Sequence, residues 1–230
     1  MTQQIDMFDK KGNKIITWSP GSLEIGKAYY GLKVIGGNRY LVLCSSTTGP
    51  AAFDVYYMKS KHGTMARGGA RTNLLLKLKP TIFSTLGTAA WAGITYNKKN
   101  IIVTFTTKIL GPEGWLYTGY IYESDWNGNL IRSTSIPVTL NKIDTDGVHY
   151  YGSYISSGYV YVLNKDFYPI RLLVLASDSK GIAVDGKNIW SVSSTTVYKY
   201  DLNGKLITSF AVGSTYYDIS TDGKYLYLIN

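Results

Sequence analysis

The sequence predicts an all-β protein, a single five-bladed β-propeller with four antiparallel strands per blade. Three observations lead to this prediction. A strand–turn–strand pattern recurs five times, a second type of hairpin follows most of these copies, and the two ends of the chain each carry half of one such unit. Because 230 residues suffice for one all-β domain with a sizeable core, we expect residues 1–230 to form a single domain.

The first repeated element is a hairpin with a tight turn. Each copy has an apolar-rich strand, a turn containing Gly or Asn, and a second apolar-rich strand, and both residue types tolerate the positive φ that such turns need. The five copies are YYGLKVIGGNRYLVL (29–43), WAGITYNKKNIIVTF (91–105), LNKIDTDGVHYYGSY (140–154), SKGIAVDGKNIWSVS (179–193) and YYDISTDGKYLYLIN (216–230). They recur at intervals of about 40–60 residues, close to the length of a propeller blade.

A second hairpin follows most of the first ones, so that each unit has four strands. Its copies are MFDKKGNKIITW (7–18), YESDWNGNLIRST (122–134), YVLNKDFYPIRLLV (161–174) and YKYDLNGKLITSF (198–210). The predicted blades are therefore 29–80, 88–137, 138–177, 178–212, and 213–230 together with 1–18. The first blade is the longest because MKSKHGTMARGGARTN (58–73) widens its second hairpin.

The two ends of the chain complete each other. The last strand has no partner after it, whereas residues 4–18 form a second hairpin with no first hairpin before it. Joined end to start, DGKYLYLIN and QQIDMFDKKGNKIITW match DGKNIWSVSSTTVYKYDLNGKLITSF almost element for element. We therefore predict that the N- and C-terminal strands share the last blade, which closes the ring and removes exposed sheet edges.

Two of the repeats resemble known propeller repeats. ISTDGKYLYLIN and IAVDGKNIWSVSSTTVYKYDLNGKLI are similar to repeats of the YVTN and NHL β-propeller families, with an Asp-Gly turn, an apolar strand and a later Asp-x-x-Gly-Lys hairpin. In the other copies NKKN replaces the Asp-Gly turn and NKDFYP replaces the Gly hairpin. The resemblance implies the fold and says little about function, because such propellers include enzymes, lectins and scaffolds.

Composition disfavours several functional classes. Cys44 is the single cysteine and His62 and His149 are the two histidines, so we expect no disulfide framework, no Cys/His zinc site and no cofactor. No apolar run approaches the roughly 18 residues of a transmembrane helix. The start, MTQQIDMFDKKGNK, lacks the apolar region of a signal peptide. We therefore expect no transmembrane insertion and a location in a virion or in the cytoplasm.

Catalysis has little support in the sequence. There is no G-x-S-x-G, P-loop or H-E-x-x-H motif. Asp144 and Asp218, near the ring of first strands, are the candidates for a glycosidase pair, but two Asp without a Glu acid make a weak pair. The hairpin turns hold six further Asp whose expected role is to cap the local backbone, namely Asp9, Asp125, Asp146, Asp185, Asp201 and Asp222. We assign no catalytic residue.

The formal charge of +9 suggests an anionic partner. In a propeller the turns within hairpins emerge on one face, here called the hairpin-turn face, and the links between hairpins and blades emerge on the opposite connection face. Basic residues gather in the hairpin turns, although turns are also where solvated lysines ordinarily lie. The predicted basic site consists of Lys10, Lys11, Lys59, Lys61, Arg67, Arg71, Lys98 and Lys99.

The connection face is predicted to be rich in aromatic and small residues. Such surfaces suit sugars and protein hot spots, whereas the structural alternative is that the rings fill the seams between blades. Two expected loops, Ser45–Phe53 and Thr107–Trp115, interrupt the repeat pattern and are therefore candidate functional insertions. The predicted partner-binding residues are Trp18, Tyr29, Tyr30, Trp91, Trp115, Tyr216 and Tyr217.

The sequence is compatible with three functions. The first is a non-enzymatic interaction or structural propeller that binds a protein or another macromolecule, the second a carbohydrate-binding propeller, and the third a propeller glycoside hydrolase. Ser, Thr and Tyr are abundant and carboxylates are few, so the composition suggests that folding is insensitive to acid. This suggests a virion or other externally exposed particle protein, of an acidophile's virus.

Overall fold

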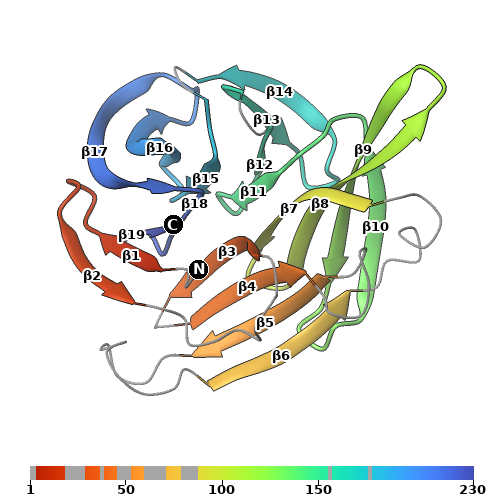
Figure 1. Ribbon diagram of the computed structural model, residues 1–230, viewed down its shortest axis with the longest axis horizontal. Coiled ribbons are helices and arrows are strands. Elements are labelled where there is room, and N and C mark those ends of the chain that lie inside the picture. The colour runs from red at the N-terminus through yellow and green to blue at the C-terminus, as the bar shows by residue number, and fades with distance from the viewer. Residues whose placement is uncertain are drawn as a thin grey trace.

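The structure, a computed structural model, describes residues 4–18, 29–36, 39–45, 53–59, 71–78, 88–154, 157–175 and 178–230. These residues form nineteen strands and no helix. Figure 1 shows their sheets arranged around a common centre, which is the arrangement of a β-propeller. The prediction of an all-β propeller is confirmed. No helix in the described ranges is long and apolar enough to cross a membrane.

The first half of the chain forms two sheets of four strands. One contains β3 (Tyr29–Gly36), β4 (Arg39–Ser45), β5 (Phe53–Lys59) and β6 (Arg71–Leu78). The other contains β7 (Thr88–Tyr96), β8 (Ile101–Gly111), β9 (Gly114–Ser124) and β10 (Leu130–Ile136). All neighbouring strands in both sheets are antiparallel, as predicted.

The next two sheets differ in strand number. The third has four antiparallel strands, β11 (Lys142–Thr145), β12 (Tyr150–Ser153), β13 (Tyr159–Leu163) and β14 (Pro169–Val174). The fourth has three, β15 (Gly181–Val184), β16 (Asn188–Asp201) and β17 (Leu206–Tyr216). Here β16 covers the residues for which the repeat pattern predicts two separate strands.

The fifth sheet joins the two ends of the chain. It contains β18 (Asp218–Thr221), β19 (Leu226–Ile229), β1 (Ile5–Phe8) and β2 (Lys14–Trp18), in that order. β1 and β19 are antiparallel, in a register that runs from Ile5↔Ile229 to Phe8↔Leu226. Beyond this ladder the amide of Asn230 donates to the carbonyl of Gln4 at 3.2 Å. The predicted pairing of the terminal strands is confirmed.

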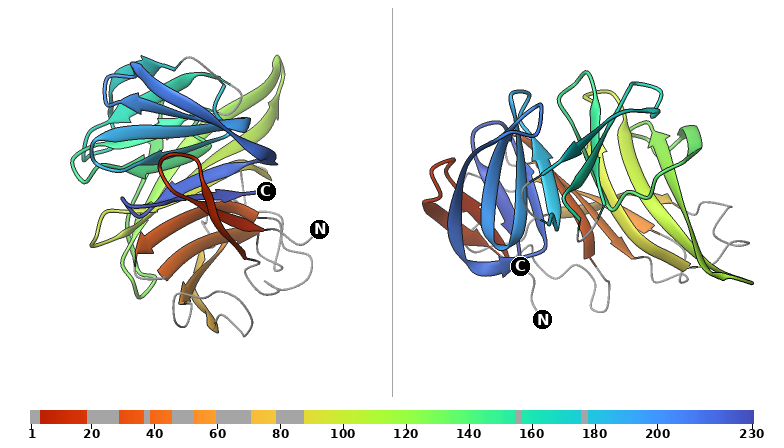
Figure 2. Two further views of the ribbon diagram at one scale, coloured as in Figure 1. Left: turned by 90° about the vertical axis from the view of Figure 1, so that its left-hand side faces the viewer. Right: turned by 90° about the horizontal axis from the view of Figure 1, so that it is seen from above.

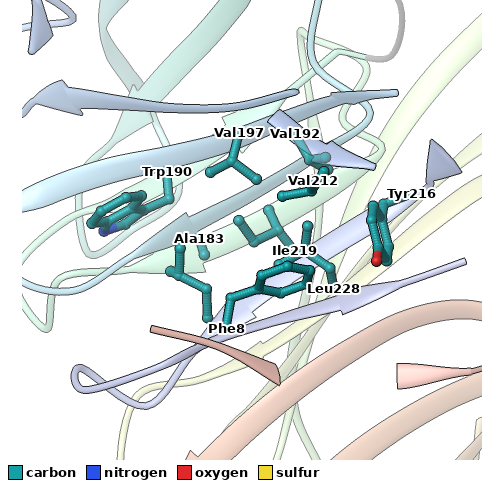
Figure 3. Close-up of a cluster of buried hydrophobic side chains, with 10 residues drawn as sticks. Phe8, Ala183, Trp190, Val192, Val197, Val212, Tyr216, Ile219 and Leu228 are labelled. Carbon is teal, nitrogen blue, oxygen red and sulfur yellow. The ribbon is translucent and has the colours of Figure 1, made fainter. Parts of the chain in front are cut away.

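The innermost strands line the axis and the apolar core lies between successive sheets. β3, β7, β11, β15 and β18 contact one another in this order, and β18 contacts β3. Clusters of buried apolar side chains fill the spaces between neighbouring sheets. Figure 3 shows the cluster between the fourth and fifth sheets, where Phe8 of β1 packs edge-on against Tyr216 with ring centroids 6.0 Å apart. The N-terminal strand therefore contributes to the core.

Two glycines allow the inner strands to approach one another closely. A Cβ atom at Gly93 would lie 2.7 Å from the Cα of Lys142 on the next inner strand. A Cβ atom at Gly181 would likewise lie 2.7 Å from the Cα of Asp218. Because real Cβ contacts are longer than this, these positions on β7 and β15 require glycine.

Candidate functional site

A cavity of about 230 Å³ lies at the hairpin-turn end of the axis. Its lining comes from all five sheets, because each inner strand contributes its last residues or the turn that follows it. The segments are 33–35, 96–98, 145–147, 184–186 and 221–223. Both signs of charge are present, with ammonium groups of Lys33 and Lys98 and carboxylates of three turn Asp. This cavity is called the axial pocket below.

One residue in the lining of the axial pocket, Lys33, belongs to a buried ion pair. Lys33 of β3 donates to Asp144 of β11, and their side chains are 8% and 2% exposed. β7 lies between these strands in the ring, so the pair spans the axis. Asp144 also accepts bonds from the hydroxyl of Thr95 at 2.7 Å and the amide of Val184 at 2.8 Å.

A second ion pair spans the axis nearer the connection face. Lys142 of β11 donates to Asp218 of β18 at 3.0 Å, and β15 separates these strands in the ring. Asp218 also accepts a bond from the amide of Ile219 at 2.9 Å. Both sequence candidates for catalysis, Asp144 and Asp218, are therefore buried acceptors bound to lysines. This arrangement fits a structural role better than acid–base catalysis, which needs a carboxyl group that exchanges its proton.

Three inner turns share one arrangement of carboxylate and aromatic ring. In each turn one oxygen of an Asp accepts bonds from backbone amides, while the other oxygen accepts a bond from the ring five residues later. The pairs are Asp146 with Tyr151 at 3.0 Å, Asp185 with Trp190 at 3.0 Å and Asp222 with Tyr227 at 2.8 Å.

The outer turns are capped in a related way, and this confirms the capping role predicted for the turn Asp. Each capping carboxylate accepts bonds from amides two and four residues later, and the capping residues are Asp9, Asp125 and Asp201. Among the described residues no three His, Cys, Asp or Glu side chains are grouped so that they could hold a metal ion.

Hydrogen bonds keep several of these carboxylates ionised. Burial alone would raise the pKa of Asp185, but bonds from Lys10, Trp190 and turn amides outweigh burial and lower the pKa to about 2. Hydrogen bonds also overcome burial at Asp6 and Asp146, where the pKa is lowered from its ordinary value of 3.8.

These shifts predict acid-induced destabilisation. A group with a lowered folded-state pKa stabilises the fold above its unfolded pKa, and this contribution is lost as the pH falls through the folded value. We therefore expect the urea unfolding midpoint to fall as the pH is lowered from 3.8 toward about 2. Lys10→Met should weaken this dependence, because Lys10 helps to lower the pKa of Asp185. A midpoint that stays constant through this range would instead support the acid insensitivity suggested by composition.

On the hairpin-turn face, lysines extend into solvent while the turn carboxylates are bound to backbone amides. Lys11, Lys98 and Lys99 of the predicted basic site are exposed. The same face carries three further exposed lysines, Lys187, Lys205 and Lys224.

The other members of the predicted basic site differ in what the structure says of them. Lys10 is not free, because its ammonium binds Asp185 at 2.5 Å and lies 5.7 Å from the centroid of the Trp190 ring. Its predicted contact with a partner stays a prediction. Lys59 and Arg71 are opposite each other on β5 and β6, and their side chains lie outside the described structure. Lys61 and Arg67 lie outside the described residues.

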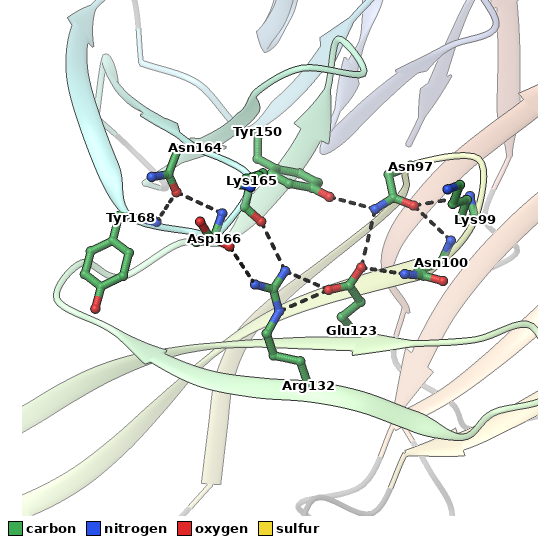
Figure 4. Close-up of polar contacts among 10 residues, drawn as sticks. All are labelled: Asn97, Lys99, Asn100, Glu123, Arg132, Tyr150, Asn164, Lys165, Asp166 and Tyr168. Atoms are coloured by element: carbon green, nitrogen blue, oxygen red, sulfur yellow. Dashed lines mark hydrogen bonds and ion pairs between the residues drawn. The ribbon is translucent and has the colours of Figure 1, made fainter.

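A polar network beside the axial pocket was not predicted from the sequence. Figure 4 shows Glu123 at its centre, with bonds from Asn100 at 2.6 Å and from Arg132 at 2.7 Å. Arg132 also donates to the carbonyl of Lys165 at 3.1 Å, and Asn97 donates to the hydroxyl of Tyr150 at 2.8 Å. The network therefore joins the second and third sheets. Arg132 donates from both Nε and Nη2 to one carboxylate oxygen of Glu123, so the arrangement fits a structural role for Glu123.

The aromatic residues expected on the connection face have different environments. Tyr217 is 59% exposed, and the ammonium of Lys180 lies 5.0 Å from its ring centroid. Tyr216 is fully buried and donates to Asp6 at 2.5 Å, so its predicted contact with a partner is corrected. Its ring fills the seam between sheets instead. The remaining side chains lie outside the described structure, namely those of Trp18, Tyr29, Tyr30, Trp91 and Trp115.

The expected loop at residues 107–115 is instead part of a long hairpin. β8 and β9 pair from Ile101↔Ser124 to Gly111↔Gly114, and a two-residue turn joins them. Gly114 has a φ of +121°, which suits glycine. Residues 46–52 of the other expected loop, Ser45–Phe53, lie outside the described residues.

The tip of this hairpin extends beyond both neighbouring strands. β10 pairs with β9 as far as Gly119, and the described part of β7 pairs with β8 as far as Lys108. Figure 2 shows the tip reaching past the rest of the sheet. Leu116 and Tyr117 in the tip are 58% and 41% exposed. Residues 109–117 are called the projecting hairpin below.

The comparisons with known proteins show a similarity of fold only. No family model matches the chain, and no curated protein matches its sequence. The structure is similar to glutaminyl cyclase from Myxococcus xanthus, with a TM-score of 0.56, 10% identity, and coverage of 90% of this chain and 94% of that chain. It is also similar to a protein of unknown function from Bacteroides caccae, with a TM-score of 0.52, 9% identity, and coverage of 92% and 73%.

Proposed function

We propose that the protein is a non-enzymatic propeller that binds a macromolecular partner, in the first place a protein, through the projecting hairpin. The observation that carries this proposal is the hairpin itself, since its tip leaves both neighbouring strands and exposes Leu116 and Tyr117. Exposed apolar and aromatic side chains suit a protein contact. The engagement of Asp144 and Asp218 with lysines supports the non-enzymatic part.

The proposal includes a scaffold of five blades. A straight strand as long as β16 would span about 46 Å. Its residues up to Val192 pair with β15, whereas those from Thr196 onward pair with β17. The pairing register shifts after Ser194, which has a positive φ of 53°. These features support a chain reversal near Ser194, so that β16 supplies the second and third strands of a four-stranded fourth blade.

The contact surface can be tested by affinity capture from cells that make the protein, with quantitative mass spectrometry. The test variant is Leu116→Ser/Tyr117→Ser, in the projecting hairpin. The control is Leu206→Ser/Ile207→Ser on β17, where the side chains are 43% and 51% exposed. We expect a partner that the wild type and the control retain equally and that the hairpin variant loses by about tenfold or more, the equivalent of one hot-spot contact.

A third variant distinguishes the two faces. Lys11→Glu/Lys98→Glu/Lys99→Glu reverses three exposed charges on the hairpin-turn face. If this variant loses the partner and the hairpin variant retains it, with binding that weakens as salt rises, the partner is an anionic macromolecule bound to the basic face. That result would contradict the proposed role of the hairpin.

The remaining expectations stay predictions. Tyr217 beside Lys180 supports an aromatic contact on the connection face, for a protein or a glycan. The origin in a virion or an acidophile's virus has no support among the described residues, and the lowered pKa of Asp185 argues against insensitivity to acid.

A further inference from the structure

The polar groups that line the axial pocket take no part in the proposed contact through the projecting hairpin. The pocket lies at the hairpin-turn end of the axis, and Lys33 in its lining is paired with the buried Asp144. Every inner strand contributes to its wall, so the ring itself holds the lining in place. A rigid, concave site with a few convergent polar groups is the usual form of a small-molecule site.

The lining offers both hydrogen-bond donors and acceptors. Lys33 carries three donors, and Asp144 is the one acceptor found for it among the described residues. The outer carboxylate oxygens of Asp146 and Asp222 each accept one tyrosine hydroxyl, and such an oxygen can accept a second bond. Apolar groups of Val34 and Val184 lie between these polar groups. The ligand must therefore carry donors, acceptors and some apolar surface.

The charges at the pocket are largely compensated. Lys33 is paired with Asp144 behind it, and Lys10 is paired with Asp185. Asp146, which has the imidazole of His149 at 3.6 Å, and Asp222 remain, with Lys98 also in the lining. A ligand of high charge would have to compete with these pairs, whereas a neutral ligand with several hydroxyl groups can bind both the ammonium and the carboxylates without disturbing them.

The volume limits the size of the ligand. The pocket holds about 230 Å³, whereas sites for drug-sized molecules have roughly 300–1,000 Å³. We propose that the axial pocket binds a single neutral monosaccharide unit, with hydroxyl groups bonded to Lys33, Asp146 and Asp222. This site is independent of the projecting hairpin and lies on the opposite face from the aromatic residues considered for glycan binding.

The proposal can be tested on the wild-type protein by ¹H–¹⁵N NMR titration with methyl glycosides of glucose, galactose and mannose. We expect at least one of them to shift the amide signals of Gly147, Gly186 and Gly223 at millimolar concentration, while Gly213, outside the lining, stays unchanged. Glucuronate should bind more weakly, because its carboxylate would be repelled by those of Asp146 and Asp222. If none of the neutral sugars shifts the pocket signals, or if glucuronate or glucosamine binds more tightly than they do, the proposal is wrong.

A matched pair of variants locates the site. Lys33→Met/Asp144→Asn removes the pocket ammonium but keeps an acceptor for Val184, and Lys142→Met/Asp218→Asn makes the same change in the other axial pair. We expect the first to weaken binding by about tenfold or more, the scale of one lost bond to a charged group, and the second to leave it unchanged. Equal binding by both variants would overturn the assignment.

Discussion

Replacement of Asp6 by alanine is expected to lower the free energy of unfolding by about 3 kcal/mol, because two or more bonds to a buried charged acceptor are lost. The Asp6 side chain is 1% exposed and lies in β1, the strand that closes the ring. It accepts bonds from the hydroxyl of Tyr216 at 2.5 Å, the ammonium of Lys14 at 2.8 Å and the hydroxyl of Thr17. Urea unfolding followed by circular dichroism measures the loss.

Asp9→Ala in the following turn serves as the control, since it removes a cap at an exposed site. Its effect should be clearly smaller than that of Asp6→Ala. The double variant Asp6→Ala/Tyr216→Phe should lose less than the sum of the single variants, because the buried hydroxyl no longer needs an acceptor. Equal losses for Asp6→Ala and Asp9→Ala would show that the buried carboxylate does not hold the ring closed.

Gly181→Ala should destabilise the ring by about 3 kcal/mol or more, at the upper end of the range for overpacking. The new Cβ atom would lie 2.7 Å from both the Cα of Asp218 and the amide nitrogen of Ile219. Backbone atoms cannot move aside as a flexible side chain can, so β15 and β18 would have to separate. Thermal and urea unfolding of the variant give the size of the effect.

Gly147→Ala is the control for Gly181→Ala, because it introduces backbone strain without steric overlap. Gly147 has a φ of +93° and open space where a Cβ atom would lie, so alanine there incurs strain alone, about 1 kcal/mol. The prediction for Gly181 fails if the two variants lose the same stability. In that case β15 and β18 can separate without loss of stability. The close approach of the inner strands at Gly93 and Gly181 would then not be needed to close the ring.

The repeat and its closure are predictable from the sequence because both depend on local signals. Asp-Gly turns mark the inner hairpins, and Gly147, Gly186 and Gly223 all have positive φ. Two turns in which another residue replaces the glycine also have a positive φ. Lys98 has a φ of 71° in the NKKN turn, and Phe167 has a φ of 66° in NKDFYP.

The parts of the site that the sequence does not reveal depend on contacts between sheets. The bonds of Arg132 to Glu123 and to the carbonyl of Lys165 join residues of the second and third sheets. No local pattern marks such a network. The sequence predicts Tyr216 at the surface because it follows a link between blades, whereas the acceptor that draws it inward, Asp6, is 210 residues away.

The projecting hairpin escapes prediction for the opposite reason. Its glycines and proline are typical of loops, so the GPEG segment favours an irregular insertion. In the structure they form a tight turn, and the apolar residues on either side extend both strands. Gly and Pro mark where the chain reverses, but they do not show how far the flanking strands continue.

The pairing of Ile5 with Ile229 also has a consequence for biosynthesis. β1 and β2 are translated before the other described strands, whereas β19, with which β1 pairs, is translated after all of them. Until β19 is made, β1 is an unpaired edge strand that can pair wrongly with neighbouring nascent chains. Closure of the ring therefore has a high contact order, and we expect it to be the slow step of folding.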